Sequence, residues 1–432
     1  MALLIKGGTV LDPGRFHGRA DVLIEKGVIA AILPMDGQFR RQPVASSEEL
    51  VVVEATGKLV VPGFVDLHVH FREPGYEYKE TIQSGATAAV AGGFTTVCCM
   101  PNTKPVNDSQ SVTEFILDRA RAAGMANVFP IGAITKGSEG LELAEIGELR
   151  AAGCVAISDD GKPVTNSAVM RRAMEYARAF DCPVVDHCED TALVDGGCMN
   201  EGVVSTELGL PGIPTAAEEV MVARNIMLAE LTGARLHLPH VSTVGSVRLV
   251  RDAKQRGVKV TAEACPHHFT LTEEAVRGYD THAKMNPPLR TWDDVQAIKA
   301  GLRDGTIDVI ATDHAPHAAH EKQLEFVDAP FGVIGLETAF PLTMAMVEEG
   351  VLSLEQAIAK LTVEPARVFG LRKGTLAPGA DADLTIVDPN EVWDVDVSRS
   401  YSKSRNTPFA GWKVKGRVCE TIVGGRRVWA AG

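Results

Sequence analysis

The feature that most constrains the fold is a series of eight apolar, strand-like segments between about residues 61 and 371, most of them followed by a helix-like stretch. The segments span 63–70, 95–102, 127–135, 154–161, 182–190, 235–243, 259–268 and 308–317, and the helix-like stretches include 111–124, 167–180 and 216–233. Strands that alternate with helices predict a parallel sheet with crossover helices. Eight repeats predict an α/β fold closed into a (β/α)8 barrel of the TIM type. An open doubly wound sheet is the alternative, but no GxGxxG phosphate loop follows the first strand.

Both ends of the chain have a different texture. Residues 2–12, 20–32 and 51–63 are β-rich runs broken by Gly, Asp and Pro, and residues 373–388 and 412–429 repeat the pattern. We therefore predict a small β-sandwich domain built from residues 1–60 and 372–432, beside a barrel domain over residues 61–371.

Charge and cysteine usage exclude several classes of protein. The chain carries 43 basic and 56 acidic residues, a net charge of −13, which argues against a nucleic-acid or anionic-membrane surface. No apolar run approaches the ~20 residues of a membrane span, and the N-terminus does not resemble a signal peptide. The eight cysteines include no CxxC pair, so we expect buried free thiols in a cytoplasmic protein.

Polar residues stand at the ends of most of the predicted strands. They include the HxH pair His68 and His70, then Asp159, Asp160, His187, His240 and Asp313. Each alone could be a hydrogen-bonded or solvated residue, and an HxH pair alone is weak evidence for a metal. The carboxyl ends of barrel strands converge on one face, however, and so many histidines and carboxylates in one mouth would be costly without a cation. Nitrogen and oxygen donors without thiolates suit Zn²⁺, with Mn²⁺ or Co²⁺ as substitutes.

Several motifs resemble those of a known family. They are PGFVDLHVHFREPG (62–75), GGFTTVCCMPNT (92–103), ISDDG (157–161), DHCED (186–190), HVST (240–243), KMNPPLR (284–290), ATDHAPHAAHEK (311–322) and GLETAFPL (335–342). Together they resemble the class I bacterial dihydroorotases of the amidohydrolase superfamily, over almost the whole chain.

The resemblance implies a metal centre of one or two Zn²⁺ ions, with two expected. His68 and His70 match ligands of the first metal, and His187 and His240 match ligands of the second. Asp313 matches both a ligand of the first metal and the general acid/base. Many relatives bridge the metals with a carbamylated lysine, which class I enzymes replace by an aspartate of the DDG motif; the family's spacing favours Asp160 over Asp159.

The resemblance also implies a substrate rim. Arg72, Asn102, Asn286 and His317 match the residues that bind the carboxylate and ring of dihydroorotate. Arg72 could instead form a surface ion pair with Glu73, and Asn102 could cap a turn. His267 and His268 are expected to be structural or to support the ligands. His314 is expected to point away from Asp313, and Cys188 is expected to be a packed thiol.

The activity implied is reversible hydrolysis of L-dihydroorotate to N-carbamoyl-L-aspartate by a metal hydroxide, a step of de novo pyrimidine (UMP) biosynthesis. Residues 318–332 are expected to form a loop that could close over the site. The alternatives are another cyclic amidase (an allantoinase, hydantoinase or dihydropyrimidinase) and a non-catalytic dihydroorotase-like subunit of aspartate transcarbamoylase. The expected partners are the small-molecule substrate, a second copy of the chain in a homodimer and aspartate transcarbamoylase, with no nucleic acid and no membrane.

Overall fold

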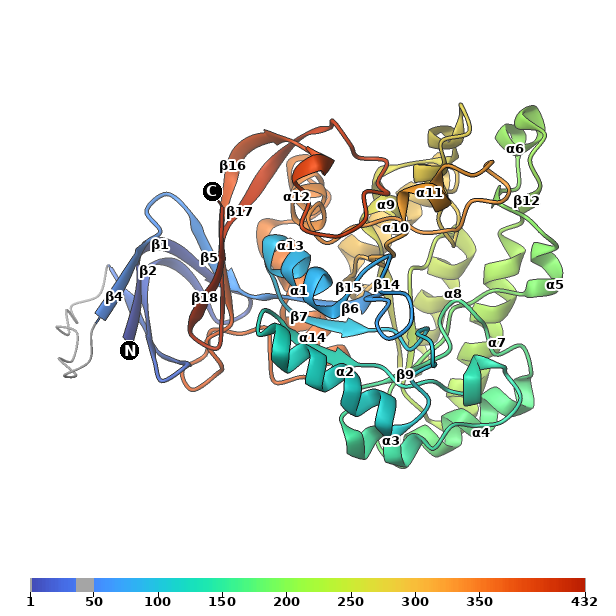
Figure 1. The fold of residues 1–432 in the computed structure, drawn as a ribbon, viewed down its shortest axis with the longest axis horizontal. Helices are drawn as coiled ribbons and strands as arrows, with labels where there is room; N and C mark the ends of the chain where they lie inside the picture. Colours follow the sequence, from blue (N-terminus) through green and yellow to red (C-terminus); the bar gives the residue numbers. More distant parts are fainter. Residues whose placement is uncertain (1, 36–49, 432) are drawn as a thin grey trace.

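The computed structural model describes residues 2–35 and 50–431, and part of the predicted range 1–60 therefore lies outside the described residues. The structure is α/β, with a large sheet built from both chain ends beside a unit in which strands alternate with helices (Figure 1). Both termini lie at the large sheet.

The eight predicted strands of the middle of the chain are confirmed. They are β6 (Phe64–Val69), β7 (Phe94–Cys99), β8 (Asn127–Pro130), β9 (Ile157–Ser158), β10 (Val184–Val185), β13 (Leu236–Leu238), β14 (Val260–Ala264) and β15 (Val309–Ile310). They form two parallel sheets, one in the order β6-β7-β8 and the other in the order β15-β14-β13-β10-β9. Two isolated parallel bridges, Gly132 with Ile157 and Val69 with His314, connect the two sheets at both of their edges.

Helices follow most of these strands, and the three predicted from the sequence are confirmed as α2 (Gln110–Ala123), α4 (Ser167–Arg178) and α7 (Ala216–Thr232). The side chain of Asn166 caps α4, and α7 ends at Gly233, whose φ of 70° is left-handed and suits glycine. The other helices are α1 (Ile82–Ala91), α3 (Ile146–Ala152), α5 (Thr191–Val194), α6 (Val203–Leu208), α8 (Val244–Gln255), α9 (Pro266–Thr270), α10 (Trp292–Asp304), α11 (Ala319–Lys322), α12 (Ala339–Glu348), α13 (Leu354–Leu361) and α14 (Val363–Phe369), and a short strand pair, β11 (Met199–Asn200) and β12 (Gly212–Ile213), follows α5.

Two apolar clusters stabilise this unit. The larger one packs strand residues such as Val97 and Leu236 against helix residues such as Ile116 and Ile226. A separate cluster joins residues of several strands, Val65 and Val309 among them, to α14. Because both clusters are buried, the strand ends that carry the polar residues have a rigid base.

The two chain ends together form a β-rich unit. Its eight strands form one continuous hydrogen-bonded sheet: β1 (Ala2–Asp12), β2 (Phe16–Glu25), β3 (Val28–Pro34), β4 (Leu50–Glu54), β5 (Leu59–Pro62), β16 (Leu384–Asp394), β17 (Lys413–Val423) and β18 (Arg426–Ala430). Residues of most of these strands pack in a further apolar cluster, and others join the larger cluster of the neighbouring unit. β1 has an irregularity between Ile5 and Gly8. Before it β1 pairs with β4, and after it β1 pairs with β5. Gly7 has a φ of 78°, and a Cβ there would lie 2.6 Å from Thr56 Oγ1, so the irregularity requires glycine.

All eight cysteines are buried and free, as predicted. None of the helices in the described parts of the chain is both long and apolar enough to cross a membrane.

Candidate metal centre and active site

The HxH pair lies at the end of β6. His68 and His70 are buried, and their ring centroids are 5.2 Å apart. The residue between them, Val69, belongs to the large apolar cluster, so the strand alternation turns both imidazoles away from it. Asp66 anchors this strand end, because its carboxylate accepts hydrogen bonds from the backbone N–H and hydroxyl of Thr312. Burial raises the pKa of Asp66 to about 7.

Asp160 lies among four histidines from three strand ends. Its Oδ1 is 3.5 Å from His68 Nε2, 3.7 Å from His187 Nδ1 and 3.5 Å from His240 Nε2, and its Oδ2 is 3.4 Å from His70 Nε2. Each of these side chains is less than a tenth exposed. This single carboxylate therefore contacts both pairs of imidazoles.

The neighbouring Asp159 points elsewhere. Its carboxylate accepts hydrogen bonds from the backbone N–H groups of Ile134 and Thr135 and from the Thr135 hydroxyl. Of the two aspartates weighed from the sequence, the structure brings Asp160 into the histidine cluster and uses Asp159 to hold the segment after β8.

Asp313 completes the cluster from the segment after β15, the last of the eight parallel strands. Its Oδ1 lies 3.0 Å from His70 Nε2 and 3.4 Å from His68 Nε2. Burial alone would raise the pKa of Asp313, but His68 and His70 hold it well below the usual range for aspartate. The backbone of Asp313 is left-handed, with a φ of 47°, as are those of His240 (33°) and Arg72 (62°). Non-glycine residues in this region are strained and tend to cluster at functional sites.

The donor set fits a metal centre. Two groups of ligand atoms can each hold an ion: His68, His70 and Asp313 in one, and His68, Asp160 and His240 in the other. Two ligands 2.0–2.1 Å from a tetrahedral Zn²⁺ would be about 3.4 Å apart, and the contacts of Asp160 and Asp313 with the imidazoles span 3.0–3.7 Å. His68 Nε2 and Asp160 Oδ1 are buried and have no hydrogen-bond partner in the structure, although such atoms normally find one.

A second layer of residues orients the histidines. His68 Nδ1 lies 2.8 Å from Glu263 Oε1, and His237 Nε2 lies 3.0 Å from the other oxygen of the same carboxylate. Although burial opposes it, the hydrogen bonds with His237 and His68 lower the pKa of Glu263 to about 2. The sequence reasoning did not single out Glu263 or His237. The signal for Glu263 was available, since it is a lone carboxylate near the end of the seventh predicted strand.

Replacing Glu263 by glutamine should weaken metal binding by about 10- to 100-fold, because a carboxylate behind an imidazole fixes its tautomer and raises its basicity. Competition with a zinc chelator measures the change. Glu218 is a matched control: it is an equally buried carboxylate that accepts hydrogen bonds from Ser242. The account of Glu263 fails if E263Q and E218Q bind zinc equally well.

Two residues of the predicted substrate rim lie on one side of the cluster. Arg72 Nε donates to the carbonyl of Pro316 (3.2 Å), and its guanidinium is 3.4 Å from His317 Nε2. His317 Nε2 is also 2.8 Å from the carbonyl of Phe331, and Lys79 Nζ donates to His317 Nδ1 (3.3 Å). Burial, Arg72 and Lys79 lower the pKa of His317, which keeps the ring neutral. Arg72 is therefore bound to the segment after β15 rather than to Glu73.

The other two rim residues contact the metal-site histidines themselves. Asn102 Oδ1 accepts from His70 Nδ1 (2.8 Å), so Asn102 also orients a predicted ligand. Asn286 Nδ2 donates to Glu189 Oε2 and lies 3.4 Å from His187 Nε2. All four predicted rim residues thus lie around the histidine cluster.

Two buried lysines anchor the segment 318–332. Lys284 Nζ donates to the carbonyls of Phe326 (2.7 Å) and Val327 (2.8 Å). Lys322 Nζ donates to the carbonyls of Thr281, Lys284 and Pro330 at 2.7–3.2 Å. These bonds hold the segment against residues 281–286, beside the predicted rim.

The remaining polar residues lie as expected. His314 turns away from Asp313, and its Nε2 is 3.4 Å from Glu80. Cys188 is packed, with its thiol donating to the carbonyl of Asp186 (3.3 Å).

Comparison with known families and proteins agrees with this geometry. Residues 57–246 match the Dihydro-orotase-like family, and residues 229–429 match the Amidohydrolase family. The chain is 55% identical to the dihydroorotase of Geobacter metallireducens over 430 residues, 99% of this chain and 100% of that protein. It is 58% identical to the dihydroorotase of Syntrophotalea carbinolica over 429 residues, 99% of this chain and 98% of that one.

Solved structures with the same fold include cyclic amidases. The L-hydantoinase of Arthrobacter aurescens matches with a TM-score of 0.87 and 26% identity, covering 100% of this chain and 96% of that one. The D-hydantoinase of Thermus sp. matches with a TM-score of 0.81 and 27% identity over the same shares. The sequence identity to the dihydroorotases is about twice the identity to these hydantoinases, and it spans the full length of the chain. The chain therefore belongs to the dihydroorotase family of the amidohydrolase superfamily.

Proposed function

We propose that the chain is a metal-dependent dihydroorotase, which interconverts L-dihydroorotate and N-carbamoyl-L-aspartate in pyrimidine biosynthesis. The observation that carries the proposal is a buried histidine–aspartate cluster with Arg72 beside it, in a chain that aligns along its whole length with dihydroorotases. The parallel bridges at both edges of the two strand sets support a closed (β/α)8 barrel as its scaffold.

We assign Zn²⁺ to the cluster, with two ions per chain. His68, His70 and Asp313 would hold the first, His187 and His240 the second, and Asp160 would bridge them. When bound, the metal supplies Lewis-acid polarisation of the ring carbonyl and lowers the pKa of water toward ~7. The two carboxylates of this cluster are buried, and bound divalent cations would neutralise their negative charge.

Asp313 would move the proton. Its low pKa keeps the carboxylate ionised, so it can accept a proton from the attacking water. The ring amide bond then breaks, and Asp313 gives the proton to the departing ring nitrogen. In ring closure the same carboxylate takes that proton back. The contact with His70 fixes the direction of the carboxylate.

The substrate carboxylate would be held by Arg72, with His317 and Asn102 beside it and Asn286 at the ring. A guanidinium can bind a carboxylate through two parallel hydrogen bonds, and this separates dihydroorotate from hydantoin, which has no carboxylate. The neutral state of His317 leaves Arg72 as the charged group of this pair.

Replacing Arg72 by methionine should raise KM for L-dihydroorotate by about 10- to 100-fold with a smaller change in kcat, because a charge-assisted contact worth ~1.5–3 kcal/mol is lost. The ring-opening assay, run with hydantoin and allantoin beside dihydroorotate, measures the change. Arg119→Met is the control, since Arg119 is exposed and pairs with Glu73. The unchanged chain should prefer dihydroorotate over both other rings. If hydantoin is preferred, or if R72M and R119M behave alike, the substrate assignment is wrong.

The non-catalytic subunit is disfavoured because all six predicted ligands are present and lie together. Association into a homodimer and with aspartate transcarbamoylase stay predictions from the family resemblance.

A further inference from the structure

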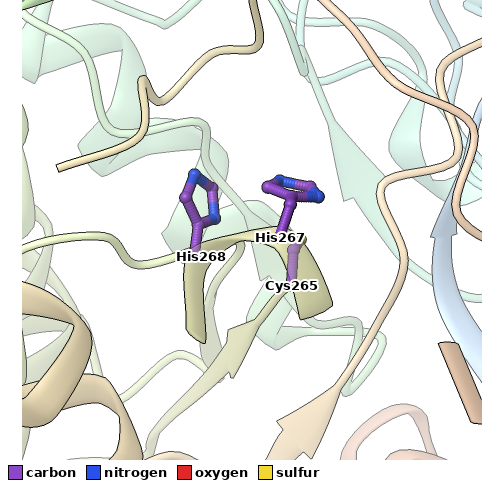
Figure 2. Close-up of side chains that lie close together, drawn as sticks. All are labelled: Cys265, His267 and His268. Carbon is purple, nitrogen blue, oxygen red and sulfur yellow. The ribbon is translucent and has the colours of Figure 1, made fainter. Parts of the chain in front are cut away.

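A second group of side chains that could hold a metal ion shares no residue with the proposed active-site ligands. Cys265, His267 and His268 follow directly after β14, at the start of α9, and all three are buried. Figure 2 shows the two imidazoles beside each other, with Cys265 just before them in the chain. Their ring centroids are 4.3 Å apart, and the nitrogen and sulfur atoms that could bind an ion all lie within 4.8 Å of one another.

Two ring nitrogens in this group have no hydrogen-bond partner. His267 Nε2 and His268 Nδ1 are both buried and unpartnered, while His268 Nε2 lies 2.9 Å from the carbonyl of Pro287. That contact assigns the proton of His268 to Nε2 and leaves Nδ1 as a lone-pair donor. A buried polar atom without a partner is destabilising, and these two imidazoles are 2% and 3% exposed.

The electrostatics suit a metal ligand rather than a charged histidine. Burial, together with the neighbouring His268, lowers the pKa of His267, and burial lowers the pKa of His268 to about 4, so both rings are neutral at physiological pH. Burial raises the pKa of the Cys265 thiol, so this sulfur stays protonated until a cation displaces the proton.

We propose that Cys265, His267 and His268 form an additional site for a thiophilic divalent metal ion of the Zn²⁺ class, separate from the His/Asp centre. Thiolate sulfur and imidazole nitrogen are typical zinc ligands, and three of them leave the fourth tetrahedral position to water. The ion takes a lone pair from each imidazole and from the Cys265 sulfur, and the thiol proton passes to the solvent. No oxidation is involved, and the inference does not depend on the proposed activity.

The site would fix the end of β14. Glu263, two residues before Cys265, contacts His68 and His237. An ion at Cys265 would hold the chain just beyond that carboxylate, and so stabilise the second layer of the active site.

Cobalt titration of the metal-depleted full chain, under reducing conditions, tests the proposal. Thiolate ligation of Co²⁺ gives a charge-transfer band in the near ultraviolet. Co²⁺ bound at the proposed active site should not give this band, because none of the proposed ligands there is sulfur. We expect this band, and we expect Cys265→Ser to lose it together with one equivalent of bound Co²⁺ per chain. His268→Gln should shift or weaken the band while Cys265 is intact.

Cys188→Ser is the matched control, because Cys188 is a buried thiol next to His187. C188S should keep the band and the stoichiometry. The proposal is overturned if the unchanged chain shows no thiolate band, if the band survives in C265S, or if C188S removes it. Since the readouts are absorption and bound metal, failure of this site and failure of the dihydroorotase activity are separate results.

Discussion

Replacing Asp313 by asparagine will lower kcat for dihydroorotate ring opening by about 10³-fold, within the range of ~10² to 10⁴ for removal of a general acid/base. In the unchanged chain, His70 Nε2 and His68 Nε2 lie 3.0 and 3.4 Å from Asp313 Oδ1. Asparagine nearly preserves the shape of the aspartate side chain, and its amide oxygen can still face both imidazoles. What it cannot do is accept and return a proton. The loss should therefore appear mainly in kcat, with a small change in KM.

Asp308→Asn is a suitable control, since Asp308 stands just before β15 but pairs with Lys254 of α8. D308N should keep nearly full turnover. Bound metal must be measured in D313N at the same time, because Asp313 is also a proposed ligand. If D313N retains its metal and turns over normally, another group moves the proton.

Replacing Asp160 by alanine will weaken metal binding by more than ~100-fold and remove measurable activity, a larger effect than loss of a supporting residue. Among the residues that the structure describes, Asp160 is the one side chain that contacts all four predicted histidine ligands. Without it, the four imidazoles remain, but no carboxylate links the two pairs. Metal analysis of the purified variant measures the loss.

Asp159→Ala separates this role from general damage. Asp159 is the adjacent buried carboxylate, and its removal leaves two backbone N–H groups without their acceptor. Burial raises the pKa of Asp159 to about 6, while its hydrogen bonds with Thr135 and Ile134 oppose that rise. D159A should unfold at lower temperature but bind metal like the unchanged chain. Equal metal loss in D159A and D160A would contradict the bridging role.

The strands and the metal ligands could be predicted from the sequence because both are local patterns. Apolar runs that end in His or Asp mark the strand ends, and parallel strands bring such ends together. The alternation of side chains along a strand also explains why only one aspartate of the pair enters the cluster. These rules need no knowledge of distant partners.

Other features depend on contacts between segments far apart in the sequence. Glu263 contacts His68 across 195 positions, and Lys284 reaches the carbonyl of Phe326 42 residues later. The single sheet at the chain ends arises from an irregularity near Gly7 that lets one strand pair with two others. Nothing in the local sequence specifies these pairings.

The measurement that tests the central claim most directly is the ring opening of L-dihydroorotate by the purified chain before chelation, after chelation and after zinc is restored. The account predicts activity that disappears with the chelator and returns with Zn²⁺, together with little or no turnover of hydantoin and allantoin. Activity that persists without metal, or a metal-replete chain that opens hydantoin but not dihydroorotate, would contradict it.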